Sequence, residues 1–124
     1  MAQIKEAYVS FETAKLLKEK GFNEDCYTCY VTDEIQHYDY KSRNSDLING
    51  VISAPTQQMA MRWLREIYDL VIYPRLVETS DIEPSWVYTI YNIFSKETEK
   101  STVLYTEPED AIDAAIKYCL ENLI

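Results

Sequence analysis

The stretch SWVYTIYNIF, residues 85–94, decides the fold, because it is the longest run of β-forming residues in the chain. Successive side chains of a strand point to opposite faces of its sheet. Here both sets are largely apolar: one holds Trp86, Tyr88, Ile90 and Phe94, and the other holds Val87, Thr89, Tyr91 and Ile93. A strand that is apolar on both faces needs cover on both. We therefore predict a central strand, with helices against one face and partial cover over the other.

Strands are also predicted before and after this run. LVIYPRLV (70–77) is rich in β-forming residues, but Pro74 has no backbone N–H to donate to a neighbouring strand. That segment is therefore predicted to be an edge strand, or to end at the proline. The charged segment KETEK (96–100) is predicted to turn the chain, so that STVLY (101–105) returns antiparallel to the central strand.

Two helices are expected in the first half of the chain, from capping residues and from apolar residues at the helical period. The first can be capped by Ser10 and stopped by a left-handed Gly21, with Phe22 folding back on Leu17. The second opens at Pro55–Thr56, and its apolar stripe comprises Met59, Ala60, Trp63, Leu64 and Ile67.

A third helix is expected at the end of the chain. Thr106 and Glu109 have the spacing of a capping box, in which each side chain bonds the backbone amide of the other residue. One continuous apolar stripe follows, made of Ala111, Ile112, Ala115, Ile116, Cys119, Leu120 and Leu123. We expect this helix to pack on the sheet and to hold the domain together.

The remaining segment supplies a short hairpin and a loop. CYTCYV (26–31) is predicted to be a strand that pairs with a second one around 35–40, and turn-forming residues in 41–54 predict a mobile loop. The element order is then α-β(β)-α-β-β-β-α. It predicts a single α+β domain over residues 1–124, with a mainly antiparallel sheet of three to five strands packed by three helices.

The charge of the chain opposes several kinds of partner. With 21 acidic and 12 basic residues, the formal net charge is −9. Nucleic acids and anionic membranes attract Lys and Arg, so an acidic chain is a poor binder of either. The sequence also lacks both an apolar run of about 20 residues, the length that spans a bilayer, and an apolar secretory signal. We expect a soluble cytoplasmic protein, whose three cysteines are reduced thiols.

The stretch DCYTCY (25–30) contains a C-x-x-C spacing, which zinc sites and thiol–disulfide enzymes use. In a regular strand, residues three apart point to opposite faces, so Cys26 and Cys29 cannot converge on one metal ion. We therefore interpret them as structural strand cysteines. The alternative is a small metal-binding protein or enzyme that uses Cys26, Cys29 and His37, with Asp25 or Asp33 as a fourth ligand.

The sequence offers no other catalytic or cofactor motif. Its two glycines exclude a G-x-G-x-x-G fingerprint and a P-loop. His37 is the only histidine, and no motif pairs it with a Ser or Cys nucleophile. We therefore predict no catalytic residue, no cofactor and no metal in the main interpretation, and a protein that is not an enzyme.

The predicted order of elements in residues 55–123, α–β–β–β–α, resembles that of double-stranded-RNA-binding domains. In that family the second helix begins with a basic cluster that contacts phosphates. The corresponding segment here, TEPEDAID (106–113), is acidic, so the resemblance is one of order only. Nucleic-acid binding through Arg62, Arg65, Arg75 and exposed tyrosines is a further alternative.

Three segments, SFETAKLLKEKGF, PTQQMAMRWLRE and DAIDAAIKYCLENLI, resemble a family of small uncharacterised proteins from Bacteroides and their phages or mobile elements. The resemblance covers about half of the chain and coincides with the three predicted helices. It implies a bacterial or phage origin and brings no activity, ligand or catalytic residue. Residues 24–53 depart most from the family pattern.

The function expected from these features is protein interaction. The chain has 11 tyrosines, and tyrosine is enriched both in strands and at protein interfaces. We expect a non-enzymatic interaction or accessory module with a protein partner that the sequence does not identify. The predicted contact residues are Tyr38, Tyr40, Arg62, Arg65 and Tyr73. The predicted edge strand at Pro74 also leaves a homo-oligomer open.

Overall fold

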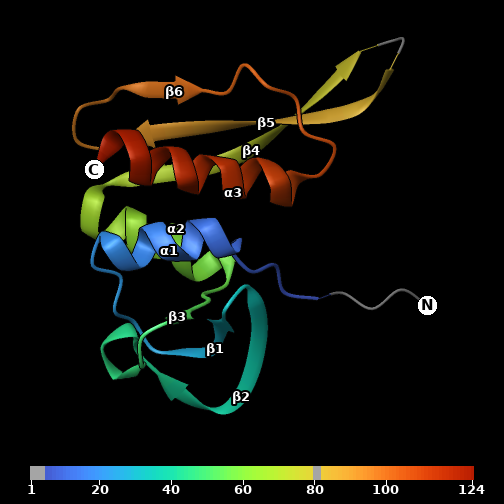
Figure 1. Cartoon of the computed structure of the whole chain (residues 1–124). Helices are drawn as coiled ribbons and strands as arrows, with labels where there is room; N and C mark the ends of the chain where they lie inside the picture. The colour runs from blue at the N-terminus through green and yellow to red at the C-terminus, as the bar shows by residue number, and fades with distance from the viewer. Residues whose placement is uncertain (1–4, 80–81) are drawn as a thin grey trace. The chain divides into compact units, whose positions relative to one another are not determined.

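The computed structural model describes residues 5–79 and 82–124. The chain is divided into two compact units, Met1–Ala60 and Met61–Ile124. The described residues form three α-helices and six strands, in the order α1-β1-β2-β3-α2-β4-β5-β6-α3 (Figure 1). This confirms the α+β class, with antiparallel pairing throughout. The strands form two sheets of three, one in each unit.

Helix α1 of the first unit, Phe11–Glu19, begins and ends as its sequence predicts. The Ser10 hydroxyl accepts a hydrogen bond from the backbone N of Thr13 at 3.3 Å. At the other end Gly21 has φ +94°, and the backbone N of Phe22 donates to the carbonyl of Leu17 at 2.9 Å. A left-handed residue followed by this backward hydrogen bond is a Schellman stop.

The sheet of the first unit has the strand order β2-β1-β3, with β1 at Cys26–Val31, β2 at Glu34–Ser42 and β3 at Val51–Ser53. The β1–β2 register is regular from Val31↔Glu34 to Thr28↔His37 and then jumps to Cys26↔Ser42, so β2 bulges over 38–41. The short helix η1, Asn44–Asp46, connects β2 to β3. The segment 41–54 therefore contains regular elements, and its mobility stays a prediction.

Helix α2, Gln57–Tyr68, begins in the first unit and continues into the second. The Thr56 hydroxyl accepts a hydrogen bond from the backbone N of Met59 at 3.1 Å, so Thr56 caps the helix. Ala60, Trp63 and Leu64 of the predicted apolar stripe are buried. The prediction was wrong for Ile67, whose surface is 58% exposed.

The sheet of the second unit has the order β4-β5-β6, with β4 at Leu70–Thr79, β5 at Ile82–Asn92 and β6 at Thr98–Lys100. Strand β5 is central, as predicted. Four consecutive residues of β5 are buried, which requires cover on both of its faces: Val87, Tyr88, Thr89 and Ile90. Strand β4 runs through Pro74 and lies at the edge, where a missing N–H removes no ladder hydrogen bond.

The segment after β5 differs from its prediction. Strand β5 ends at Asn92, so Phe94 does not lie on the predicted buried face and its surface is 87% exposed. Strand β6 falls at 98–100, inside the predicted turn, whereas 101–105 forms only an isolated bridge between Tyr105 and Trp86. The turn begins earlier than predicted because the Asn92 side chain accepts hydrogen bonds from the backbone N of Phe94 and of Ser95, which ends the strand at Asn92.

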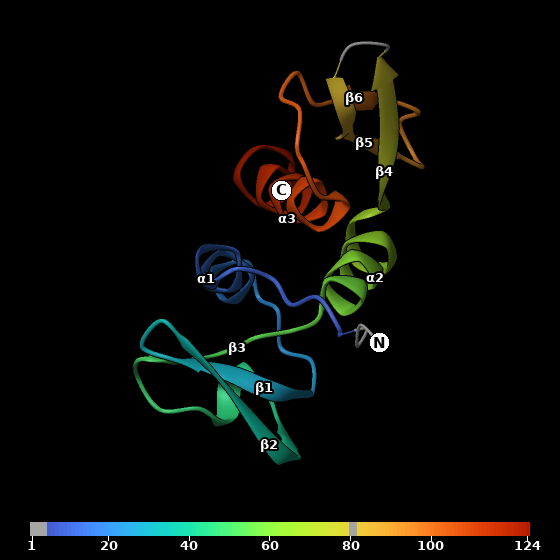
Figure 2. The ribbon, with the colours of Figure 1, turned by 90° about the vertical axis from the view of Figure 1, so that its right-hand side faces the viewer.

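Helix α3, Pro108–Tyr118, lies along β5 and β4 in the second unit (Figure 2). The predicted capping box was wrong: Glu107 is the N-cap, its side chain makes no capping hydrogen bond, and Pro108 starts the helix. Proline is favoured at the first helical position, which moves the start past Thr106. A π-helical turn, Cys119–Leu123, extends the helix. The predicted stripe is buried at Ala111, Ala115, Ile116, Cys119 and Leu120, but Leu123 is 37% exposed.

Candidate functional site

The two cysteines of the C-x-x-C lie in strand β1, as predicted, and both are buried. Their side chains have different neighbours. The Cys29 thiol lies beside the Tyr38 side chain, while the Cys26 thiol faces Met59 and the backbone oxygen of Glu24. His37 lies on β2, where its ring contacts the ring of Tyr8 at 5.6 Å between centroids.

The predicted alternative metal site needs Cys26, Cys29 and His37 to converge. Within residues 5–79 and 82–124, no group of three or more His, Cys, Asp or Glu side chains is arranged to hold a metal ion. Cys26 and Cys29 do not join one ligand group because strand β1 gives their side chains different surroundings. The structure does not bring these three residues together as a ligand set.

Burial also makes these thiols poor nucleophiles. Burial, with a smaller contribution from the Asp25 carboxylate, raises the pKa of Cys26 to about 11. Burial likewise raises the pKa of Cys29 and, in the second unit, raises that of Cys119 to about 12. The nucleophilic form of cysteine is the thiolate, so a raised pKa lowers the reactivity of these thiols near neutral pH.

Two of the predicted contact residues, Tyr38 and Tyr40, lie together on β2. Their ring centroids are 5.2 Å apart, and 37% and 59% of their surfaces are exposed, respectively. Strand β2 is the edge of its sheet. The pair therefore presents two partly exposed aromatic rings beside an open strand edge, a combination that suits protein contacts.

The other three predicted contact residues belong to the second unit. Arg62 and Arg65 are exposed on α2, and Tyr73 is 46% exposed on β4. The Arg62 guanidinium binds the Glu66 carboxylate at 3.0 Å, which engages part of its charge. The five residues are thus distributed over both units, and their role in binding stays a prediction.

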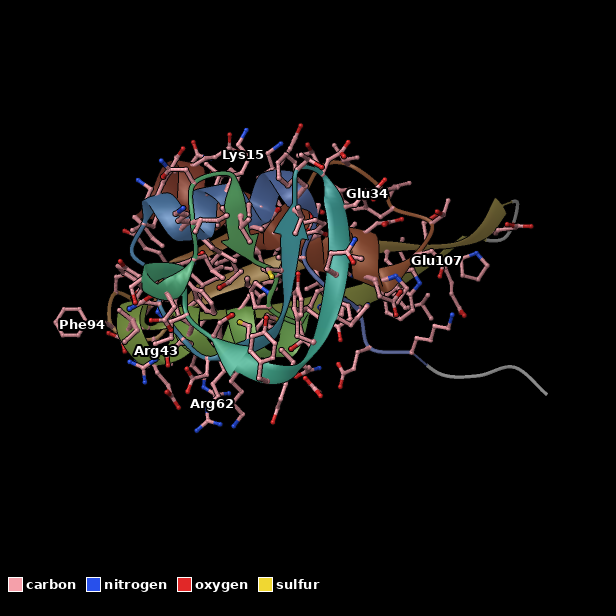
Figure 3. All side chains as sticks on the ribbon, turned by 60° about the horizontal axis from the view of Figure 1, so that its bottom comes forward. Lys15, Glu34, Arg43, Arg62, Phe94 and Glu107 are labelled. Atoms are coloured by element: carbon pink, nitrogen blue, oxygen red, sulfur yellow. The ribbon has the colours of Figure 1, made fainter. Side chains whose placement is uncertain are left out.

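The turn between β5 and β6 holds an exposed aromatic ring in a fixed backbone. The side-chain oxygen of Asn92 accepts hydrogen bonds from the backbone N of Phe94 at 3.0 Å and from that of Ser95 at 2.9 Å. The backbone N of Asn92 also donates to the carbonyl of Glu97 at 2.9 Å. The Phe94 ring points away from the ribbon (Figure 3), so the ring is exposed although the backbone carrying it is hydrogen-bonded.

A cavity of about 270 Å³ adjoins this turn within the second unit. Its polar lining combines the Glu97 and Glu99 side chains with two carboxamides, Asn92 and Asn122. Its apolar lining comes from Leu70, Ile90 and Leu123. Carboxylates beside an apolar wall suit a cationic group carried on an aliphatic stem.

Sequence reasoning missed this turn and its cavity. The available signal was Asn92, because asparagine favours turns by bonding the backbone two residues ahead. That signal was outweighed by the alternation of apolar residues, which placed Phe94 in the strand. Asn92 and Glu97 lie in one turn, but Asn122, on the π-helical turn after α3, reaches the cavity only through the way that helix lies along the sheet, and no local pattern encodes that.

No helix in the part of the chain that the structure describes is both long and apolar enough to cross a bilayer. Comparisons with known proteins found no matching family model, no matching curated protein and no matching solved structure.

Proposed function

We propose that the chain is a non-enzymatic protein-interaction module, and that the β5–β6 turn of its second unit contacts the partner. Phe94 is the observation that carries this proposal. A phenylalanine that is 87% exposed contributes little to its own fold. Covering such a ring in a complex contributes about 1.5–3 kcal/mol to binding.

The backbone of the turn supports a binding role. The Asn92 side chain bonds both the Phe94 and the Ser95 amides, so the ring extends from an ordered segment. An ordered segment loses less conformational entropy on association than a flexible one. Ile93, which precedes Phe94 and is 42% exposed, widens the apolar contact.

The surroundings of the turn favour a basic partner. Glu97 and Glu99 line the neighbouring cavity, whose apolar wall can hold the stem of a lysine or arginine. The chain as a whole has a net charge of −9, which attracts a basic surface over a longer range. We therefore expect a protein that presents an apolar side chain or pocket next to a lysine or arginine.

The test is affinity capture from the native host with three baits: the wild type, Phe94→Ser and a matched control, Ile48→Ser. Ile48 is 77% exposed in the first unit, so both variants remove an exposed apolar side chain. Bound proteins are quantified by mass spectrometry in parallel samples with and without nuclease treatment. We expect one dominant protein whose recovery falls at least about tenfold with Phe94→Ser only, as the loss of one buried ring implies.

A second pair of baits tests the partner's charge. Glu97→Gln with Glu99→Gln removes the two cavity carboxylates, whereas Glu12→Gln with Glu19→Gln removes two exposed carboxylates of α1. Only the first pair of substitutions is expected to lower recovery of the partner. The recovery that remains should depend less on salt concentration than it does with the wild type. Equal recovery with every bait would contradict the proposed surface, and recovery that disappears with nuclease would favour nucleic-acid binding.

A further inference from the structure

Two sulfur atoms meet in the first unit, in a place that the C-x-x-C spacing does not indicate. The thiol sulfur of Cys26, on β1, lies 3.8 Å from the thioether sulfur of Met59, in the first turn of α2. Both residues line a cavity of about 250 Å³. The pair is therefore in contact with a space that a small ligand could fill.

A buried hydroxyl lies beside the same thiol. Ser53, on β3, is 1% exposed, and its hydroxyl oxygen has no conventional hydrogen-bond partner among the described residues. The Ser53 hydroxyl favours the Cys26 thiolate and so lowers the pKa of Cys26, although burial raises that pKa by more. A buried polar group without a firm partner costs free energy, so its position calls for an explanation.

We propose that Cys26 and Met59 bind one monovalent soft metal ion of the copper(I) class. Thiolate and thioether sulfurs are soft ligands, which select copper(I) over harder ions. Metal–sulfur bonds are about 2.3 Å long, so one ion can bridge two sulfurs up to about 4.6 Å apart. The Cys26 thiol donates a hydrogen bond to the Met59 sulfur, and the sulfur separation of 3.8 Å lies within this limit.

The charges around the pair favour a monovalent ion. Binding replaces the thiol proton: Cys–SH and Cu⁺ give Cys–S–Cu and H⁺, while the Met59 sulfur donates a lone pair. The product carries no net charge, which suits a buried position. A divalent ion would keep a positive charge and would need further ligands. The nearby Asp25 carboxylate is already bound to Arg43 at 3.0 Å.

The cavity supplies a route to the sulfurs. Exposed Asp25, Tyr27 and Lys41 line it together with the buried Cys26. The Lys41 ammonium lies over the Tyr27 ring, 5.5 Å from its centroid. That contact holds the ammonium against an aromatic ring, and Cys26 and Met59 are the two sulfur-bearing residues of the lining.

The test is an anaerobic titration of the full chain, with reduced thiols, using copper(I) held by bicinchoninate as a coloured competitor. We expect one copper(I) per chain and release of one proton. Met59→Leu keeps the side-chain volume and should lower affinity at least about tenfold, the scale for losing a supporting group of a metal site. Met61→Leu, on the same helix, is the matched control and should leave affinity unchanged.

Cysteine variants separate this site from the alternatives. Cys26→Ala should abolish binding, whereas Cys29→Ser and Cys119→Ser should retain it, with circular dichroism confirming that each variant is folded. Binding that Met59→Leu leaves unchanged, or that Cys29→Ser abolishes, would overturn the assignment. So would a stoichiometry far below one copper(I) per chain in the wild type.

Discussion

The side-chain oxygen of Asn44 accepts a hydrogen bond from the backbone N of Ser53 at 2.9 Å. The amide nitrogen of the same side chain donates to the carbonyl of Phe22 at 2.8 Å. Asn44 is buried, with 8% of its surface exposed. One side chain therefore satisfies the backbone N of Ser53, on β3, and the backbone carbonyl of Phe22, just after α1. It thereby holds η1 to both segments.

Replacing Asn44 by Leu should destabilise the protein. The change leaves the Ser53 amide and the Phe22 carbonyl without these partners, and a buried unsatisfied group costs about 1–3 kcal/mol. Since two groups are affected, we expect the free energy of unfolding to fall by at least the cost of one such group in urea titrations. Asn49→Leu, at an exposed position, is the control. Equal stabilities of the two variants would show that the Asn44 hydrogen bonds contribute nothing.

Gly21→Ala should destabilise α1 through its backbone alone. Gly21 has φ +94°, and an added Cβ would meet no atom within 4 Å. A non-glycine residue in this region costs about 1–2 kcal/mol. The melting temperature should fall for Gly21→Ala and fall less for Gly21→Asn, because asparagine tolerates left-handed φ. An unchanged melting temperature for Gly21→Ala would contradict the Schellman stop.

Stability should decrease at alkaline pH because of the buried thiols. Burial raises the pKa of Cys26 to about 11 and that of Cys119 to about 12, whereas a free cysteine has a pKa of about 8.5. The folded state therefore holds these protons more tightly than the unfolded state does. The contribution of the protonated thiols to the free energy of unfolding is complete below about pH 8.5 and is lost as pH rises toward 11–12. The free energy of unfolding then falls by up to about 1.4 kcal/mol per pH unit for each thiol.

The measurement for that pH dependence is urea unfolding with a reductant between pH 8 and 11. Cys119→Ala should flatten the decline, although cavity formation lowers its stability at every pH. An identical slope in wild type and Cys119→Ala would assign the decline to the other groups whose pKa burial raises, first Cys26 and then Tyr88.

Asn92→Ala should loosen the β5–β6 turn without removing Phe94. The change deletes the acceptor of the Phe94 and Ser95 amides, so these amides should exchange with solvent at least about tenfold faster. Amide hydrogen exchange followed by NMR measures this directly. Ser95→Ala, which removes only the hydroxyl that accepts from the Glu97 amide, is the milder comparison. Unchanged exchange at Phe94 would mean that its exposure does not rest on an ordered turn.

The parts of the fold that sequence predicts best are those set by local contacts. Ser10, Leu17, Gly21 and Phe22 all lie within α1 or next to it, so their spacing contains the whole capping arrangement. Strand β5 was predictable for a similar reason, because a run that is apolar on both faces belongs at the centre of a sheet.

The parts that sequence did not predict depend on distant partners. The contact between Cys26 and Met59 joins residues 33 positions apart, which no sequence motif indicates. The C-x-x-C spacing instead relates Cys26 to Cys29. Strand β6 is three exposed residues, and only its pairing with Thr89–Tyr91 makes it a strand. Division of the strands into two sheets likewise follows from tertiary pairing, which alternation within a segment does not encode.

The border between the two units, after Ala60, falls inside helix α2. Truncation after Ala60 would leave Gln57–Ala60 at the end of the first fragment, and this single helical turn is too short to stay helical alone. The first fragment would then lose the ordered backbone that positions Met59. Fragments for separate expression should therefore each retain all of Gln57–Tyr68, and the two fragments will overlap by the length of one helix.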